Sequence, residues 1–94
     1  MENKWIGSIG QRLNGLELKV VFIKQFESEW GVSTLHKFVD EEGNSFSWFS
    51  SSKTLEMGSS YRLNGTVKKH EEYKERKTTQ LTRCMKIEEV MGNE

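Results

Sequence analysis

The stretch SFSWFSSSKTLEMGSSYRLNGTVKK, residues 45–69, combines two candidate strands with the connection between them. Residues 45–50 are short, aromatic and largely alternating, which predicts a strand. Three consecutive serines then offer an N-cap for one helical turn around residues 53–57, which Gly58 would close. Residues 60–69 alternate again and predict the next strand. The order in this stretch is therefore strand, short helical connection, strand.

Three more strands are indicated on either side of it. Every second residue from Leu16 to Phe22 is apolar, as in a half-buried strand. Val21 and Ile23 add apolar groups on the opposite face, so the end of this strand is expected to be covered on both sides. Residues 32–40 and 78–90 complete a set of five strands, and the polar residues 70–77 would connect the last two.

Five strands with a helical connection after the third are typical of a small all-β Greek-key barrel of the OB type. Closing the sheet removes its edges, and the helical turn plugs the open end of the barrel. An SH3-like barrel or an open sandwich is the alternative. Ninety-four residues suffice for one domain, 1–94, with a core at about 5–87 and an acidic C-terminal tail at 88–94.

Composition restricts the environment and the activity. No apolar run approaches the ~18 residues of a membrane span, and the first ten residues lack the apolar core of a signal peptide. Cys84 is the single cysteine and cannot form an internal disulfide, so we expect a cytoplasmic protein. His36, His70 and Cys84 are too scattered for a zinc site. No metal, cofactor or enzymatic activity is predicted.

Charge is distributed unevenly although the net charge is zero. Residues 1–60 carry six Lys and Arg against eight Asp and Glu. Residues 61–86 carry eight basic residues against three acidic ones, and residues 87–94 carry three acidic residues. A local basic patch can attract phosphates over a Debye length of roughly 10 Å even on a neutral protein.

Three segments carry a resemblance to a known family. They are IGQRL at 9–13, STLHKFVDEEGNSFSWFSS at 33–51 and GSSYRLNGTVKKHEEYKERKTTQLTRC at 58–84. Together they resemble the small OB-fold modules of bacteriophage and bacterial replication proteins, over a span from Trp5 to Cys84. This resemblance implies an OB fold and single-stranded DNA as the ligand, in DNA replication or recombination in a bacterial cytoplasm.

Aromatic residues supply the first half of the predicted binding site, because every base has a face on which a ring can stack. OB folds bind their ligand across strands two and three, between the loop that joins strands one and two and the loop that joins strands four and five. Trp30 lies in the first loop and Tyr73 in the second. Phe46 and Trp48 share one face of the third strand and Phe49 has the other. Trp48 is a candidate for binding, although alternation does not decide which set faces the ligand and a buried Trp48 is favoured.

Basic residues supply the second half, since cations contact the phosphates. Lys37 is expected to project from the second strand onto the binding face. The residues around Tyr73 form a cluster that would close over the DNA as an arm, and paired with nearby glutamates they could equally be a solvated face. The cluster consists of Lys68, Lys69, Lys74, Arg76 and Lys77.

Two other functions fit the same sequence. A protein-interaction module, acting as an adaptor or inhibitor of a replication or host enzyme, agrees with the neutral net charge and the acidic tail. An RNA-binding OB domain is the second alternative. The sequence does not fix the oligomeric state.

Overall fold

The computed structural model describes residues 3–91, which form one sheet of five strands and contain no helix. The five strands that the sequence predicted are present, and the all-β class is confirmed. No helix in this part of the chain could cross a membrane. The strands are β1 (Arg12–Ser28), β2 (Gly31–Val39), β3 (Ser45–Ser50), β4 (Ser60–Tyr73) and β5 (Arg76–Val90).

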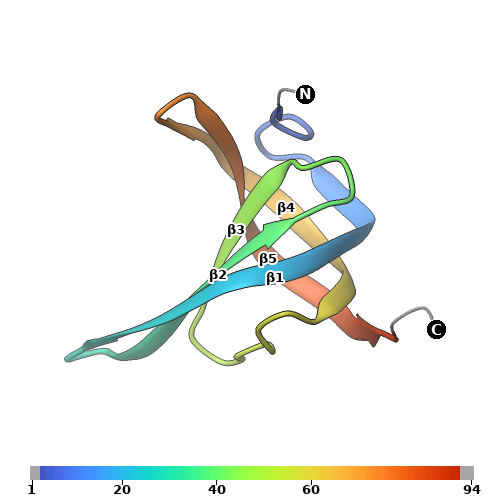
Figure 1. The fold of residues 1–94 in the computed structure, drawn as a ribbon. Coiled ribbons are helices and arrows are strands. Elements are labelled where there is room, and N and C mark those ends of the chain that lie inside the picture. Colours follow the sequence, from blue (N-terminus) through green and yellow to red (C-terminus); the bar gives the residue numbers. More distant parts are fainter. Residues whose placement is uncertain (1–2, 92–94) are drawn as a thin grey trace.

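The sheet closes on itself in the order β1-β2-β3-β5-β4. Strand β1 makes this possible because it is long enough to pair with two neighbours: its first part, Arg12–Lys19, pairs with β4 and its second part, Lys19–Ser28, pairs with β2. Strands β3 and β5 are parallel, and all other pairs are antiparallel. Strand β3 lies between β2 and β5 in this ring, near the centre of the view in Figure 1.

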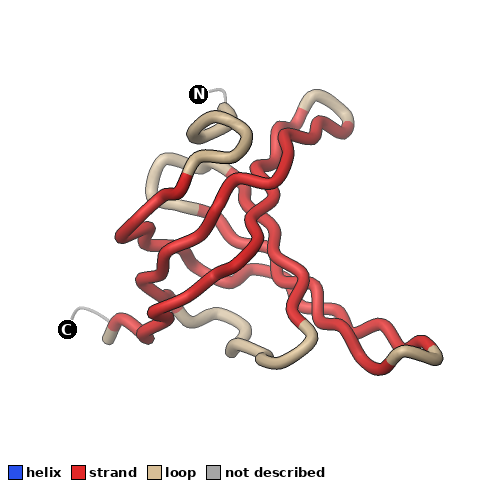
Figure 2. Tube along the Cα trace, turned by 180° about the vertical axis from the view of Figure 1, so that it is seen from behind, coloured by secondary structure: helices blue, strands red, loops and turns tan. Residues whose placement is uncertain are grey.

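Two hairpins project from this ring and diverge from each other (Figure 2). The first arm, residues 24–35, is the outer part of β1 and β2 and turns at Glu29 and Trp30. The second arm, residues 69–80, is the outer part of β4 and β5. The sequence predicted a loop at 70–77, but the strands continue to the tip. Lys74 and Glu75 form the turn, with φ of 50° and 66°, as tight hairpins require.

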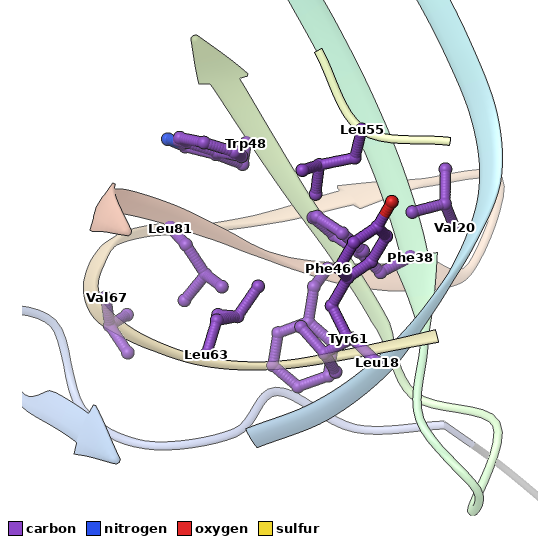
Figure 3. Packing of buried hydrophobic residues seen from close by; sticks show 10 residues of the cluster. All are labelled: Leu18, Val20, Phe38, Phe46, Trp48, Leu55, Tyr61, Leu63, Val67 and Leu81. Atoms are coloured by element: carbon purple, nitrogen blue, oxygen red, sulfur yellow. The ribbon is translucent and has the colours of Figure 1, made fainter. Parts of the chain in front are cut away.

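The core fills the inside of the ring (Figure 3). Each strand contributes the residues of one face, as the period of two requires. Leu55 is the exception, because it comes from the connection between β3 and β4 and closes one end of the core. The buried apolar residues are Leu18, Val20, Phe38, Phe46, Trp48, Leu55, Tyr61, Leu63, Val67 and Leu81.

A bulge in β1 changes which residues face the core. Val20 lies opposite Phe38 and Phe22 lies opposite Lys37, so β1 has one extra residue, Val21, at this point. An extra residue reverses the alternation of the side chains beyond it. The sequence placed Phe22 on the core face with Val20, and this was wrong: Phe22 lies on the outer face.

The predicted helical turn around residues 53–57 is absent, and the connection between β3 and β4 is irregular. Side chains accept from the backbone N–H groups of this connection. The hydroxyl of Ser50 accepts from Lys53, and Nε2 of His36 accepts from Leu55 at 3.0 Å. The hydroxyl of Tyr61 accepts from the backbone N–H of Glu56 at 2.8 Å. These acceptors are side chains of the ring, so the connection follows the ring rather than helical geometry.

The acidic end is not a free tail as far as the structure describes it. Residues 88–90 belong to β5 and pair with residues 60–62 of β4. Residues 92–94 of the predicted tail lie outside the described residues.

Candidate nucleic-acid interface

The outer face of β1, β2 and β3 carries side chains in cross-strand rows. One row joins Phe22 on β1 to Lys37 on β2 and Ser47 on β3. The next row joins Lys24, Leu35 and Phe49 in the same way. Residues directly opposite each other in antiparallel strands share a face. This face therefore mixes rings with lysines between the bases of the two arms, and we call it the outer face.

The rings of the outer face lie close to each other and to the lysines. The centroids of Phe26 and Phe49 are 6.3 Å apart, with the ring planes tilted by 44°. Nζ of Lys37 lies 5.4 Å from the centroid of Phe22, and Nζ of Lys24 lies 5.3 Å from that of Phe26. These are cation–π distances. Phe49 is 49% exposed, so its ring is available to a ligand.

The second arm borders the outer face with one of its two sides. Two adjacent hollows, of about 250 and 330 Å³, lie where this arm meets β2 and β3, and both are lined by Lys37, Tyr73 and Thr78. Arg76 lines the smaller hollow and Phe49 the larger one. The Tyr73 ring is 75% exposed. The larger hollow thus brings Tyr73, Phe49 and Lys37 around one space.

The opposite side of the second arm is covered by the N-terminal segment. The indole Nε1 of Trp5 donates to the carbonyl of Glu71 at 2.9 Å, and the Trp5 ring stacks on His70 at 5.0 Å. The Asn3 side chain donates to the carbonyl of Lys77 and accepts from its N–H. These contacts hold the second arm from behind, and we call residues 3–7 the brace.

The predicted basic cluster is divided between the two sides of the arm. Lys77 was predicted to contact DNA, but its Nζ lies 5.3 Å from the centroid of Trp5 on the braced side. Lys74 lies at the tip, over the Tyr73 ring at 5.4 Å. Arg76 faces the smaller hollow, and its guanidinium donates to the carbonyl of Gly43 at 3.1 Å. The structure therefore brings Lys74 and Arg76, but not Lys77, toward the outer face.

Lys68 and Lys69 lie at the base of the second arm, where the register between β4 and β5 shifts. Lys69 forms an ion pair with Glu71 at 3.5 Å. Lys68 is exposed. Neither Lys68 nor Lys69 lines the two hollows.

The two predicted tryptophans have different environments. Trp30 is 88% exposed at the tip of the first arm, where the predicted binding role requires it. Trp48 is 7% exposed and belongs to the core, stacked on His36 at 5.0 Å. Of the two positions that the sequence left open for Trp48, the structure has the buried one, because residues 46 and 48 alternate toward the inside of the ring and leave Phe49 outside.

Carboxylates also border the hollows. Glu71 and Glu72 line the larger one, and they reduce the positive potential that the lysines create there. Attraction of phosphates to this surface is therefore local, and the rings must contribute a large share of any binding energy.

The titratable groups with shifted pKa values lie away from the outer face. Burial lowers the pKa of His36, which is enclosed in the core, while its bond to the Trp48 carbonyl opposes this shift. Burial raises the pKa of the Cys84 thiol to about 12, against a smaller opposing effect of the Arg12 charge. No group of three or more metal-ligating residues occurs within residues 3–91.

Sequence reasoning missed two rings of the outer face, Phe22 and Phe26. The alternation from Leu16 to Phe22 assigned Phe22 to the core and made no assignment for Phe26, and the bulge at Val21 turns both outward. The adjacent apolar pair Val20 and Val21 was a signal of this bulge, because a strand with one solvated face does not need both.

Comparisons with protein-family models, with curated proteins and with solved structures found no match to this chain.

Proposed function

We propose that this protein binds single-stranded DNA on the outer face, between its two arms, with little sequence preference and without catalysis. The observation that carries the proposal is the arrangement of Phe49, Tyr73 and Lys37 around one hollow that is open to solvent. A ring that stacks on a base contributes roughly 1–3 kcal/mol, and a lysine between rings can contact the phosphate that joins the bases.

We also infer that the ring of strands is of the OB type. Its order β1-β2-β3-β5-β4, with a long first strand shared by two neighbours and a parallel β3–β5 pair, supports this assignment. OB folds bind oligonucleotides on strands two and three, between the connections that correspond to the two arms. Lys37 and Phe49 lie on these two strands, and Phe22, Lys24 and Phe26 lie beside them on β1.

The positions of the lysines are consistent with a single strand whose bases stack on successive aromatic rings. Lys24, Lys37 and Lys74 each lie within cation–π distance of an exposed ring. A strand that stacks its bases on these rings would bring its phosphates to these lysines. Duplex DNA, whose bases are already stacked and paired, cannot use the rings in this way.

The proposal is tested by fluorescence anisotropy with labelled oligo(dT), oligo(U) and a DNA duplex at low salt. Saturable binding of oligo(dT), weaker binding of the duplex and a linear fall of log K with log salt would support it. Stronger binding of oligo(U) would replace DNA by RNA as the ligand. No saturable binding to any of the three would reject a nucleic-acid function.

A protein-interaction module is the second candidate. It is favoured by Glu71 and Glu72 at the larger hollow, since carboxylates repel a phosphate backbone but tolerate a peptide. The rings of the outer face would then hold apolar side chains of a partner. The anisotropy experiment separates the two functions, because this candidate predicts no binding of any oligonucleotide.

A further inference from the structure

Strand β1 has a free edge along the first arm. On one side, β1 pairs with β2 as far as Ser28. On the other side, β4 pairs only as far as Lys19, and Val20 then exchanges backbone hydrogen bonds of 2.9 Å with Gly58 and Ser59. Within residues 3–91, no backbone partner lies on this side of residues 22–28. An extended strand with unpaired N–H and C=O groups is a template for another strand.

Exposed apolar side chains lie along this edge, on the outer face. Val21, Phe22 and Phe26 are each 42% exposed. The sequence pattern predicted that the end of this strand is covered on both sides, yet the single chain leaves it open. Natural edge strands are normally shortened or charged to prevent pairing. Lys24 and Glu27 are the charged residues of residues 22–28, which is weak protection for an edge of this length.

We propose that a second copy of this chain pairs with this edge, so that residues 22–28 of the two copies form an antiparallel pair about a twofold axis at Gln25. Antiparallel pairing of a segment with itself places one residue opposite its own copy. Gln25 is the midpoint of the free segment, so this register uses the whole edge. The inference goes beyond the proposed function and does not depend on it.

The side chains agree with this register. A centre at Gln25 places Lys24 opposite Phe26 of the second copy, twice by symmetry. The same two side chains already form a cation–π contact within one chain, with Nζ 5.3 Å from the ring. A centre at Lys24 would instead oppose two like charges, which destabilises a strand pair. At the axis itself, the two glutamines can hydrogen-bond to each other through their amides.

Pairing at this edge would join the two outer faces. Phe22 and Phe26 lie on the outer face next to the edge, so the ring-bearing surfaces of both copies would become continuous across the axis. The second arm of each copy stays accessible, because β5 joins the sheet on the side of β3 away from this edge.

Sedimentation equilibrium of the protein without any ligand tests the proposal. We expect twice the mass of one chain for the wild type and a shift to monomer for Gln25→Lys, which places two like charges opposite each other at the axis. Val32→Lys adds the same charge to the exposed side of β2 in the same arm, and it should remain dimeric. A monomeric wild type at the highest soluble concentration, or a dimer that Gln25→Lys leaves unchanged, would overturn the proposal.

Cysteine cross-linking tests the register. Two Gln25→Cys chains would place their thiols opposite each other, within the range of a disulfide. Two Glu27→Cys chains would hold them four strand positions apart, about 13 Å, and serve as the matched control. Cys84 is half-buried with a raised pKa, so it reacts slowly in both variants. Under copper–phenanthroline, we expect a covalent dimer with Gln25→Cys only. Equal cross-linking of both variants, or of neither, would contradict the register.

Discussion

The two arms differ in how they are held, although each presents one exposed ring near its tip. The brace contacts the second arm at Glu71, Lys77 and Thr79 through hydrogen bonds and stacks Trp5 on His70. In the first arm, the hydrogen bonds of residues 26–33 stay within the arm itself. The second arm is therefore fixed against the ring of strands, while the described residues give the first arm no comparable support.

This difference in support distinguishes the exposed ring of the second arm from that of the first arm. Tyr73 is exposed but sits on a supported hairpin, so its position relative to Phe49 and Lys37 is defined before a ligand binds. Trp30 is 88% exposed on a hairpin that has no such support within the chain, and its ring must be ordered on binding. Ordering a side chain at an interface costs roughly 0.5–1.5 kcal/mol. A pre-positioned ring thus contributes more to affinity than a mobile one.

The largest expected effect follows from removing the pre-positioned rings. Phe49→Ala combined with Tyr73→Ala should weaken oligo(dT) binding by about 2–6 kcal/mol, if each ring stacks on one base. Tyr73→Ala alone should weaken it by about 1–3 kcal/mol and leave the salt dependence nearly unchanged, because a ring releases no counterions. Fluorescence anisotropy over a salt series measures both quantities.

Trp30→Ala is the matched variant on the first arm. It should cost less binding free energy than Tyr73→Ala because of the ordering cost. A larger effect of Trp30→Ala would reverse the comparison between the two arms.

The brace is tested by Trp5→Ala. Loss of the stack on His70 and of the hydrogen bond to Glu71 should lower the free energy of unfolding by about 2 kcal/mol. Hydrogen exchange should accelerate at residues 70–79 of the second arm but not at residues 26–33. Chemical denaturation and mass-resolved hydrogen exchange measure these effects. Uniform acceleration in both arms would mean that the brace supports the whole ring.

The features of the fold and the site that could be predicted from the sequence are those that depend on residues close together in the chain. Alternation predicted all five strands, and the polar neighbours of Tyr73 predicted its exposure. The brace was invisible because Trp5 and Glu71 are far apart in the chain, so Lys77 was assigned to the DNA-binding cluster. The helical turn at 53–57 was predicted from local residues alone, whereas His36 and Tyr61, which come from other strands, hold this connection through its backbone N–H groups. Phe22 was misplaced by a single extra residue.

A smaller effect is expected from the lysines that lie over rings. Lys37→Ala with Lys74→Ala should reduce the magnitude of the salt slope for oligo(dT) by about 1.4, since each single-strand phosphate contact contributes about 0.7. Lys77→Ala removes the same charge from the braced side of the second arm. It should leave the slope unchanged, and an equal reduction by Lys77→Ala would show that the DNA follows the braced side.

Protonation of His36 should have the smallest effect at neutral pH. Because His36 lies in the core, this protonation should destabilise the whole fold and therefore both arms alike. Its Nε2 accepts from the Leu55 N–H, so the neutral ring with the proton on Nδ1 is the one that fits the core. Burial lowers its pKa in the folded state, whereas the unfolded chain binds a proton near the ordinary value of 6.5. Stability is therefore complete above pH 6.5 and declines as the pH falls below it.

Thermal denaturation between pH 8 and pH 5, with hydrogen exchange at both arms, measures this effect. His36→Gln should remove the part of the pH dependence that is due to this residue. An unchanged pH profile in His36→Gln would show that other groups cause the acid sensitivity.

Amide chemical-shift mapping with unlabelled oligo(dT) tests the central claim most directly. We predict that the shifts concentrate on Lys37, Phe49 and Tyr73, with smaller changes at the tip of the first arm. Residues 17 and 40–42, which line an acidic hollow elsewhere on the surface, should not change. Shifts centred on that acidic hollow or on the brace, with none at Phe49 and Tyr73, would contradict binding between the arms.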